Sequence, residues 1–304
     1  MLYFYTENFF ISKRIKNFFK GILGFKIRGP EEVFRSLKDG LNSLGVDFIV
    51  NQRIVTSVDT ACVLSGADVL NWAIGQKKKG LIKKLVAGPN VVTTPLDFGR
   101  LIQDPNIDMI VSPSDWVVKW WLSLAPGLER KLKVWAAGVS ESALFSQAGE
   151  KVVVFVKDKE SKLSNEIIGS LQAKNLPMEK IVYGNFSYDQ YATLLSQAKV
   201  LIYIGKSESQ GLALLQAWMA NVPTLVYNPR FMRYKNFKWQ DEKIAAPYLN
   251  SHVGEFFSNS EDFEEIFSSF LKNSKNFQPR RYVMENFTDE ICAKKFIDLI
   301  YEKN

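Results

Sequence analysis

The sequence predicts an α/β protein built from two doubly wound domains with parallel sheets. Short, β-rich apolar runs alternate with helical patterns along almost the whole 304-residue chain. These runs are apolar throughout instead of alternating with polar residues, which is typical of parallel strands that are covered on both faces. The chain is 46% hydrophobic and 23% charged, and its length suffices for two cores of about 150 residues each.

The first half contains six candidate strands, at 2–6, 47–51, 61–65, 84–88, 108–112 and 132–136. A helical pattern covers 31–44, where Val33, Leu37 and Leu41 share one face and Gly45 supplies the stop. These elements predict a first domain over residues 1–138.

The second half repeats this order of elements. Its candidate strands are 151–156, 180–184, 199–205 and 222–228, with helices near 162–174, at 188–197 and after Gly211. Gly, Ser and Ala cluster at 137–149, which indicates a linker. The second domain is therefore expected over 139–287. A C-terminal helix at 288–304 follows, with Thr288 as its N-cap and acidic residues in its first turn.

Composition limits the chemistry. His252 is the only histidine, and the two cysteines, Cys62 and Cys292, lack metal-like spacing, so His-based nucleophilic machinery, a structural zinc site and a disulfide framework are not indicated. No Asp-x-Asp metal motif is found, and no metal or other cofactor is expected. Cysteine usage fits a reducing, cytoplasmic setting. The net charge of +7 suggests an anionic partner: nucleic acid, a lipid surface or a phosphorylated substrate.

No apolar run approaches the roughly 18–20 residues that cross a bilayer, and the N-terminal charges are not arranged as in a signal peptide. The segment 9–25 instead reads as a basic amphipathic helix rich in phenylalanine. Two interpretations stay open: an interfacial membrane anchor on the inner face of a membrane, or a helix packed on its own domain. An anchor would suit a lipid-linked or membrane-borne ligand.

The stretch SESQGLALLQAWMANVP, residues 207–223, is the main candidate site. Ligands of open α/β sheets bind beyond the carboxyl ends of the strands, where helix N-termini attract anions. Glu208 lies in the loop after strand 199–205, and Gly211 opens the next helix. The amides of Gln210, Gly211 and Leu212 would then point into the cleft and hold a diphosphate.

This stretch resembles the E-x7-E signature of retaining glycosyltransferases of family 4. The matching residues are Glu208, Gly211, Leu212, Gln216, Ala217, Met219, Ala220 and Pro223. KVWAAGVSESALF near the midpoint, VSPSDWV at 111–117 and RRYVMENFTDEICAKKF near the end are also similar to segments of that family. The resemblance implies the GT-B fold, in which two facing Rossmann-like domains hold a nucleotide sugar in the cleft between them.

The resemblance also assigns roles to residues of the second domain. It implies that Glu208 contacts hydroxyls of the donor sugar and that Gln216, in place of the second glutamate, binds the ribose. Lys157 and Lys162 resemble the basic pair that faces the diphosphate. The expected donor-binding loops contain Ser209, Gln210, Gly211 and Leu212 after one strand, and Tyr183, Gly184, Asn185 and Phe186, which would hold the base, after another.

In the first domain, Gly29 resembles the glycine loop near the phosphate and the acceptor. Two features depart from the family pattern. Gln216 is neutral, and a neutral hydrogen bond contributes about 0.5–1.5 kcal/mol against roughly 1.5–3 kcal/mol for a charged acceptor. The first domain also lacks the histidine that the family often has at the end of a strand. Asn90 stands near that place, although Gly-Pro-Asn is also a common turn sequence.

These observations predict a hexosyltransferase that moves a sugar, with retention and without metal, from a nucleotide-diphosphate donor to a hydroxyl of a glycan or glycolipid. One alternative is a protein of the same shape that binds a nucleotide sugar or a membrane without turnover. The other is a nucleic-acid binder, which the charge alone suggests. Because nothing in the sequence resembles a base-stacking or groove-reading module, no nucleic-acid partner is expected.

Overall fold

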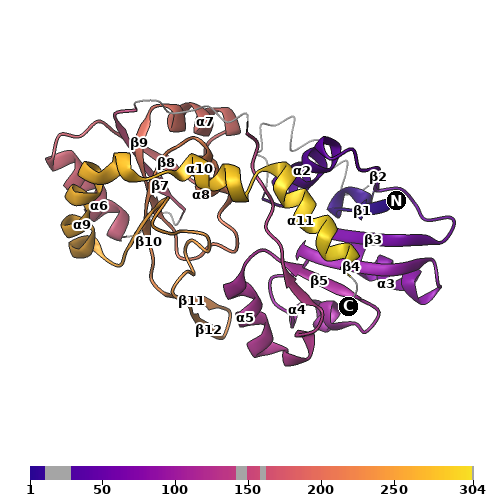
Figure 1. Ribbon diagram of the computed structural model, residues 1–304. Coiled ribbons are helices and arrows are strands. Elements are labelled where there is room, and N and C mark those ends of the chain that lie inside the picture. The colour runs from indigo at the N-terminus through magenta and orange to yellow at the C-terminus, as the bar shows by residue number, and fades with distance from the viewer. Residues whose placement is uncertain (11–28, 142–148, 158–161, 303–304) are drawn as a thin grey trace. The chain divides into compact units, whose positions relative to one another are not determined.

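The computed structural model describes residues 1–10, 29–141, 149–157 and 162–302. It divides into two compact units: unit 1 is Met1–Ala137 with Cys292–Asn304, and unit 2 is Gly138–Ile291. Each unit contains a parallel sheet flanked by helices (Figure 1), so the α/β class predicted from the apolar strands is confirmed. Most of the predicted amphipathic segment 9–25 lies outside the described residues.

The sheet of unit 1 has the strand order β2-β1-β3-β4-β5-β6, and all its neighbours are parallel. Its strands are β1 Leu2–Tyr5, β2 Phe48–Val50, β3 Val58–Ser65, β4 Ile82–Asn90, β5 Met109–Ser112 and β6 Leu132–Val134. All six predicted strands are present with shifted ends. The strand predicted at 84–88 continues to Asn90, which pairs with Ser65.

Helices of unit 1 follow the strands. They are α2 Gly29–Ser43, α3 Ala67–Lys78, α4 Asp97–Arg100 and α5 Asp115–Leu124, with short 3-10 turns at η1 Glu7–Phe9, η2 Leu101–Gln103 and η3 Pro126–Leu128. Helix α2 buries Val33, Leu37 and Leu41, the face that the periodicity predicts. The chain leaves this helix through Gly45, whose φ is +65°.

The last helix, α11 Asp289–Tyr301, packs largely on unit 1. The Thr288 hydroxyl accepts a hydrogen bond from the Ile291 amide at 3.2 Å, which confirms the predicted N-cap. Further along, the Phe296 ring lies 4.8 Å from that of Trp135, and the Trp135 indole donates to the Cys292 carbonyl at 2.9 Å. The C-terminus of the chain thereby completes the core of its first domain.

Unit 2 contains a five-stranded sheet in the order β13-β10-β9-β7-β8, again parallel throughout. The strands are β7 Lys151–Val156, β8 Met178–Val182, β9 Ala198–Ile204, β10 Thr224–Tyr227 and β13 Gly254–Phe257. The helices are α6 Lys162–Ala173, α7 Tyr188–Ser196, α8 Leu212–Met219, α9 Ser260–Asn273 and α10 Pro279–Asn286. No element is predicted for 229–287 from the sequence. The structure places β13, α9, α10 and an antiparallel hairpin, β11 Phe231–Tyr234 with β12 Phe237–Gln240, in that stretch.

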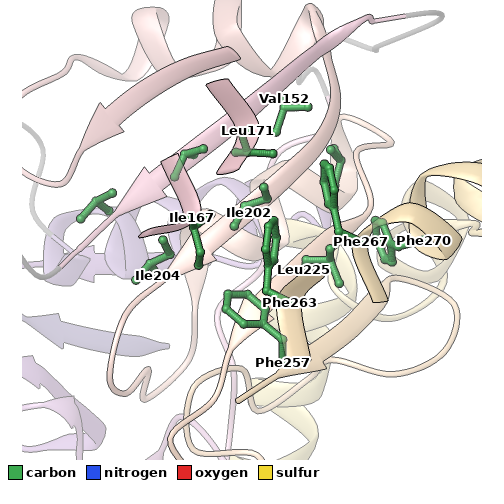
Figure 2. Close-up of a cluster of buried hydrophobic side chains, with 13 residues drawn as sticks. Val152, Ile167, Leu171, Ile202, Ile204, Leu225, Phe257, Phe263, Phe267 and Phe270 are labelled. Carbon is green, nitrogen blue, oxygen red and sulfur yellow. The ribbon is translucent and has the colours of Figure 1, made fainter. Parts of the chain in front are cut away.

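The two faces of this sheet carry different cores. On one face, side chains of α6 and α9 pack against alternate strand residues, as Figure 2 shows for Ile167, Phe263 and Ile202. On the other face the Phe155 ring stacks on Tyr203, with centroids 4.9 Å apart, and contacts Tyr191 of α7 at 5.7 Å. Because successive residues of a strand point to opposite faces, this second face is where strand side chains reach toward the candidate site.

Candidate functional site

The carboxyl edge of the unit 2 sheet gathers three of the predicted loops. The Lys157 amide, one residue past β7, donates to the Ile204 carbonyl at 2.8 Å, and the Tyr183 amide, one residue past β8, donates to the Val156 carbonyl at 2.9 Å. The loop that holds Glu208 leaves the adjacent strand β9. The parallel register therefore brings residues 51 positions apart, Lys157 and Glu208, to one edge.

Glu208 is the centre of this site. Its side chain is only 13% exposed, and its Oε1 accepts hydrogen bonds from Lys157 Nζ at 2.5 Å and from the Tyr203 hydroxyl. The Glu208 amide donates to the Ile244 carbonyl at 2.9 Å, which holds the loop from the other side. The carboxylate is therefore held in a defined place, because both its backbone and its side chain are bonded.

Tyr203 supplies the neutral donor of this arrangement. Burial, and then the negative charge of Glu208, raise the pKa of the Tyr203 phenol well above its usual value. The phenol therefore stays protonated and can donate to the carboxylate. Sequence reasoning did not identify Tyr203 as a site residue. The available signal was a tyrosine in the otherwise aliphatic strand KVLIYIG, two residues before the strand ends.

Lys157 lies between a carboxylate and an aromatic face. Its Nζ is 5.6 Å from the centroid of the Tyr183 ring, a distance typical of a cation–π contact. The side chain is still 31% exposed, so an anionic ligand can reach the ammonium. Gly205 permits this approach, because a Cβ there would lie 3.0 Å from Tyr203 Cε1 and 3.3 Å from Lys157 Cβ.

The predicted partner cation, Lys162, has a different environment. It is the first residue of α6, its side chain is 92% exposed, and its Nζ lies 3.4 Å from Glu166 on the same helix. The hydrogen bonds and ion pairs of the described residues thus join Lys157, but not Lys162, to Glu208. Solvation and a one-turn helical pair account for the position of Lys162.

Helix α8 begins next to Glu208. Gly211 is its N-cap, with φ +81° and ψ +49°, and the first ladder bond runs from the Leu215 amide to the Gly211 carbonyl at 3.0 Å. The amides of Leu212, Ala213 and Leu214 have no intrahelical acceptor, because Leu215 is the first amide of the ladder, so an anion in front of the helix can accept their hydrogen bonds. Gln210 is buried, Ser209 is exposed, and Gln216 is half-buried in the second turn.

The predicted base loop forms a turn after β8. The Asn185 amide donates to the Val182 carbonyl at 2.9 Å, and Gly184 has φ +81°. The half-buried Phe186 ring packs edge-on against Phe155 at 5.6 Å. Since Tyr183, at the start of the turn, is 51% exposed, the loop offers an aromatic side chain next to the Lys157 ammonium.

The first-domain candidates lie in unit 1. Gly29 is the exposed first residue of α2. Asn90 ends β4, and its Nδ2 is buried without a hydrogen-bond acceptor among residues 1–10, 29–141, 149–157 and 162–302. The buried hydroxyls of Ser112 and Ser114, at the end of the neighbouring strand, likewise find no partner in that part of the chain. This edge of the unit 1 sheet therefore contains polar groups that the described residues leave unsatisfied.

Within the part of the chain that the structure covers, no group of three or more His, Cys, Asp or Glu side chains is arranged to hold a metal ion. Among the same residues, no helix has the length and apolar character needed to span a bilayer.

Comparisons with known proteins identify the fold. No family model matches the sequence, and no curated protein matches it either. Solved structures do match: the apo form of the lipopolysaccharide outer core galactosyltransferase WaaB has a TM-score of 0.58 over 90% of this chain and 80% of its own, at 13% identity. WaaG, a glycosyltransferase involved in lipopolysaccharide biosynthesis, has a TM-score of 0.57 at 11% identity, with all of both chains covered.

A third match is TarM of S. aureus, in complex with Fondaparinux, alpha-GlcNAc-glycerol and UDP. Its TM-score is 0.54 at 11% identity, and the match covers 80% of this chain and 55% of the TarM chain. Identities this low concern the fold alone. The chain has the GT-B type of fold seen in these glycosyltransferases, with two Rossmann-like parallel-sheet domains, and the predicted fold class is confirmed.

Proposed function

We propose that this protein is a retaining glycosyltransferase of the family 4 type, which transfers a sugar from a nucleotide-diphosphate donor to a hydroxyl of a glycan or glycolipid. The main support for this proposal is the Glu208 carboxylate, which Lys157 and Tyr203 hold directly before the glycine-capped start of α8. Such a combination of cation, carboxylate and helix N-terminus at the carboxyl edge of a parallel sheet suits a sugar joined to a diphosphate.

In this proposal the leaving diphosphate is stabilised by charge. The bond between the anomeric carbon and the phosphate oxygen breaks, and negative charge grows on that oxygen. Lys157 Nζ and the first-turn amides of α8 face the growing charge and stabilise the transition state more than the ground state. Because these groups supply positive charge, the proposed reaction proceeds without a metal ion.

The remaining steps are part of the same proposal. Glu208 accepts hydrogen bonds from donor-sugar hydroxyls, and Gln216 bonds the ribose. The acceptor oxygen forms the new bond on the face from which the diphosphate departs, and its proton passes to the departing phosphate oxygen. No separate general base is required, which suits a chain whose single histidine, His252, lies outside this group of residues.

The acceptor is proposed to be a glycan or a lipid-linked sugar. This fits TarM, whose structure contains UDP and alpha-GlcNAc-glycerol, and WaaG, whose described role is in lipopolysaccharide biosynthesis. Peripheral association with an anionic membrane, through the basic segment 9–25 of a cytoplasmic protein, belongs to the same proposal. Binding of a nucleotide sugar without turnover is the second candidate, and the neutral Gln216 favours it.

The first experiment is donor binding and hydrolysis by the full chain across a panel of UDP-, GDP- and ADP-sugars. We expect one donor to be consumed, and Glu208→Ala to abolish its consumption. Glu179→Ala is the matched control, because Glu179 forms an exposed ion pair with Lys151 at 3.1 Å, at the opposite end of β7. Saturable binding of a nucleotide sugar without release of its nucleotide, whether or not an acceptor hydroxyl is supplied, would favour the non-catalytic candidate. Equal loss in both variants would contradict the role of Glu208.

A further inference from the structure

The hairpin β11–β12 has one face that its own unit does not cover. In the antiparallel register Phe231 lies opposite Gln240, and Arg233 lies opposite Lys238. These four side chains are the more exposed ones, apart from the turn, while Met232 on the other face is buried. The alternation is that of a two-stranded ribbon with an inner and an outer side.

An open pocket of about 570 Å³ is formed on this hairpin. It is lined by Phe231, Arg233, Lys238, Trp239 and Gln240. The volume lies in the range of sites that hold a small organic ligand. The lining combines two cations, an amide and two aromatic rings, so the pocket offers both basic groups and apolar surface.

Two positive charges face each other across this pocket, which is an unfavourable arrangement. Arg233 and Lys238 are a directly opposed pair, and like charges in that position destabilise a ribbon. Along the described chain, neither side chain has an ion-pair partner. An anion bound between the two cations would remove the repulsion, and the planar guanidinium is suited to a carboxylate or phosphate group.

The rest of the lining fits a sugar. Phe231 is 48% exposed, and its ring offers an apolar surface for the C–H face of a pyranose. Gln240 can both donate to and accept from hydroxyls. Trp239 lies opposite Met232 on the inner face of the ribbon and also lines the pocket, and its buried indole N–H has no acceptor within the described residues.

The base of the hairpin is tied to the loop of the candidate site. The Asp241 amide donates to the Arg230 carbonyl at 3.1 Å, and the Asn228 side chain donates to the Glu242 carbonyl at 2.5 Å. Two residues later the Ile244 carbonyl accepts the Glu208 amide at 2.9 Å. The hairpin therefore emerges beside the residue that is proposed to contact the donor sugar.

We propose that the β11–β12 pocket is an acceptor subsite for a negatively charged sugar chain, with the carboxylate or phosphate of the sugar between Arg233 and Lys238 and its ring on Phe231. This inference rests on the proposed function and specifies its acceptor class. The Gln240 amide and the exposed Phe231 ring favour a sugar over a lipid surface.

The test measures binding to the full chain by calorimetry, in the absence of donor. The probes are tetragalacturonate, mannose 6-phosphate, neutral maltotetraose, inorganic phosphate and phosphatidylglycerol vesicles. We expect the two charged sugars to bind more tightly than maltotetraose and phosphate. The double variant Arg233→Gln/Lys238→Gln is expected to weaken their binding at least 10-fold, and Phe231→Ala to weaken charged-sugar binding without changing phosphate binding.

The matched control is Lys272→Gln/Lys275→Gln, which removes the same charge from two exposed positions, one in the last turn of α9 and one just after it. Equal weakening in this control would show non-specific attraction and overturn the proposal. Binding to vesicles alone, to phosphate as tightly as to the sugars, or to neither charged sugar would overturn it too. Consumption of the sugar donor by the unmodified chain is measured separately. If no donor is consumed, the proposed function is refuted. If donor is consumed but no charged sugar binds, only the acceptor subsite is refuted.

Discussion

Tyr203→Phe tests whether the buried phenol positions the Glu208 carboxylate. The variant removes one hydroxyl, and it keeps the ring that stacks on Phe155 at 4.9 Å. A hydrogen bond to a charged acceptor contributes about 1.5–3 kcal/mol. If the proposed transition state depends on a fixed carboxylate, this loss corresponds to a reduction of about 10- to 150-fold in kcat/KM for the donor, since each 1.4 kcal/mol is a factor of ten.

The assay is donor consumption under the conditions of the first experiment, with the unfolding free energy measured in parallel. Tyr191→Phe is the matched control, because Tyr191 is buried in the same aromatic group and donates to the Ala213 carbonyl at 2.9 Å. The control is expected to cost about 0.5–1.5 kcal/mol of stability with little change in kcat/KM.

The reasoning would be refuted if Tyr191→Phe and Tyr203→Phe reduced kcat/KM equally. A double-mutant cycle with Glu208→Gln adds a second check. Because Tyr203 is argued to act through Glu208, its effect should nearly vanish when the carboxylate is already absent. Additive losses would mean that Tyr203 acts only on the packing of the sheet.

Three further outcomes are expected. Lys157→Ala should lower kcat for the sugar donor by about 10²-fold or more, as does loss of other groups that stabilise a developing negative charge. Lys151→Ala, at the opposite end of β7, is the control and should leave kcat unchanged. Similar kcat values for both variants would contradict the role of Lys157. Gly211→Ala should cost about 1–2 kcal/mol in urea unfolding because Gly211 has φ +81°, whereas Gly169→Ala, in open space within α6, should be neutral or stabilising. Above pH of about 10 the unfolding free energy should fall, because unfolded tyrosines release a proton there and the folded Tyr203, whose pKa is raised, does not. The slope is about 1.4 kcal/mol per pH unit for one such group, and a Tyr203→Phe titration with an unchanged slope would exclude this residue as its source.

Local patterns were sufficient for much of the fold. Uniformly apolar runs identify β7 and β9, and the Val33, Leu37 and Leu41 face identifies α2, because burial requires the same spacing wherever such an element packs. The loop around Glu208 and the start of α8 at Gly211 could also be placed, since a glycine after a strand end is a local signal. The hairpin β11–β12 was not predicted, because only uniformly apolar runs were assigned as strands, whereas this segment alternates an aromatic inner face with a charged outer face.

What the sequence by itself determined, then, is the strands of the two parallel sheets up to residue 228, several of their helices, and that Glu208 lies in a loop at a strand end. Only the tertiary structure decided the partners of that glutamate. The register of β7 against β9 places Lys157 and Tyr203 on Glu208, while Lys162, also a lysine and five residues from Lys157, pairs with Glu166 along its helix. The physical reason is that secondary structure follows from contacts within a few residues, whereas a site depends on which strands are neighbours and on which face each side chain emerges.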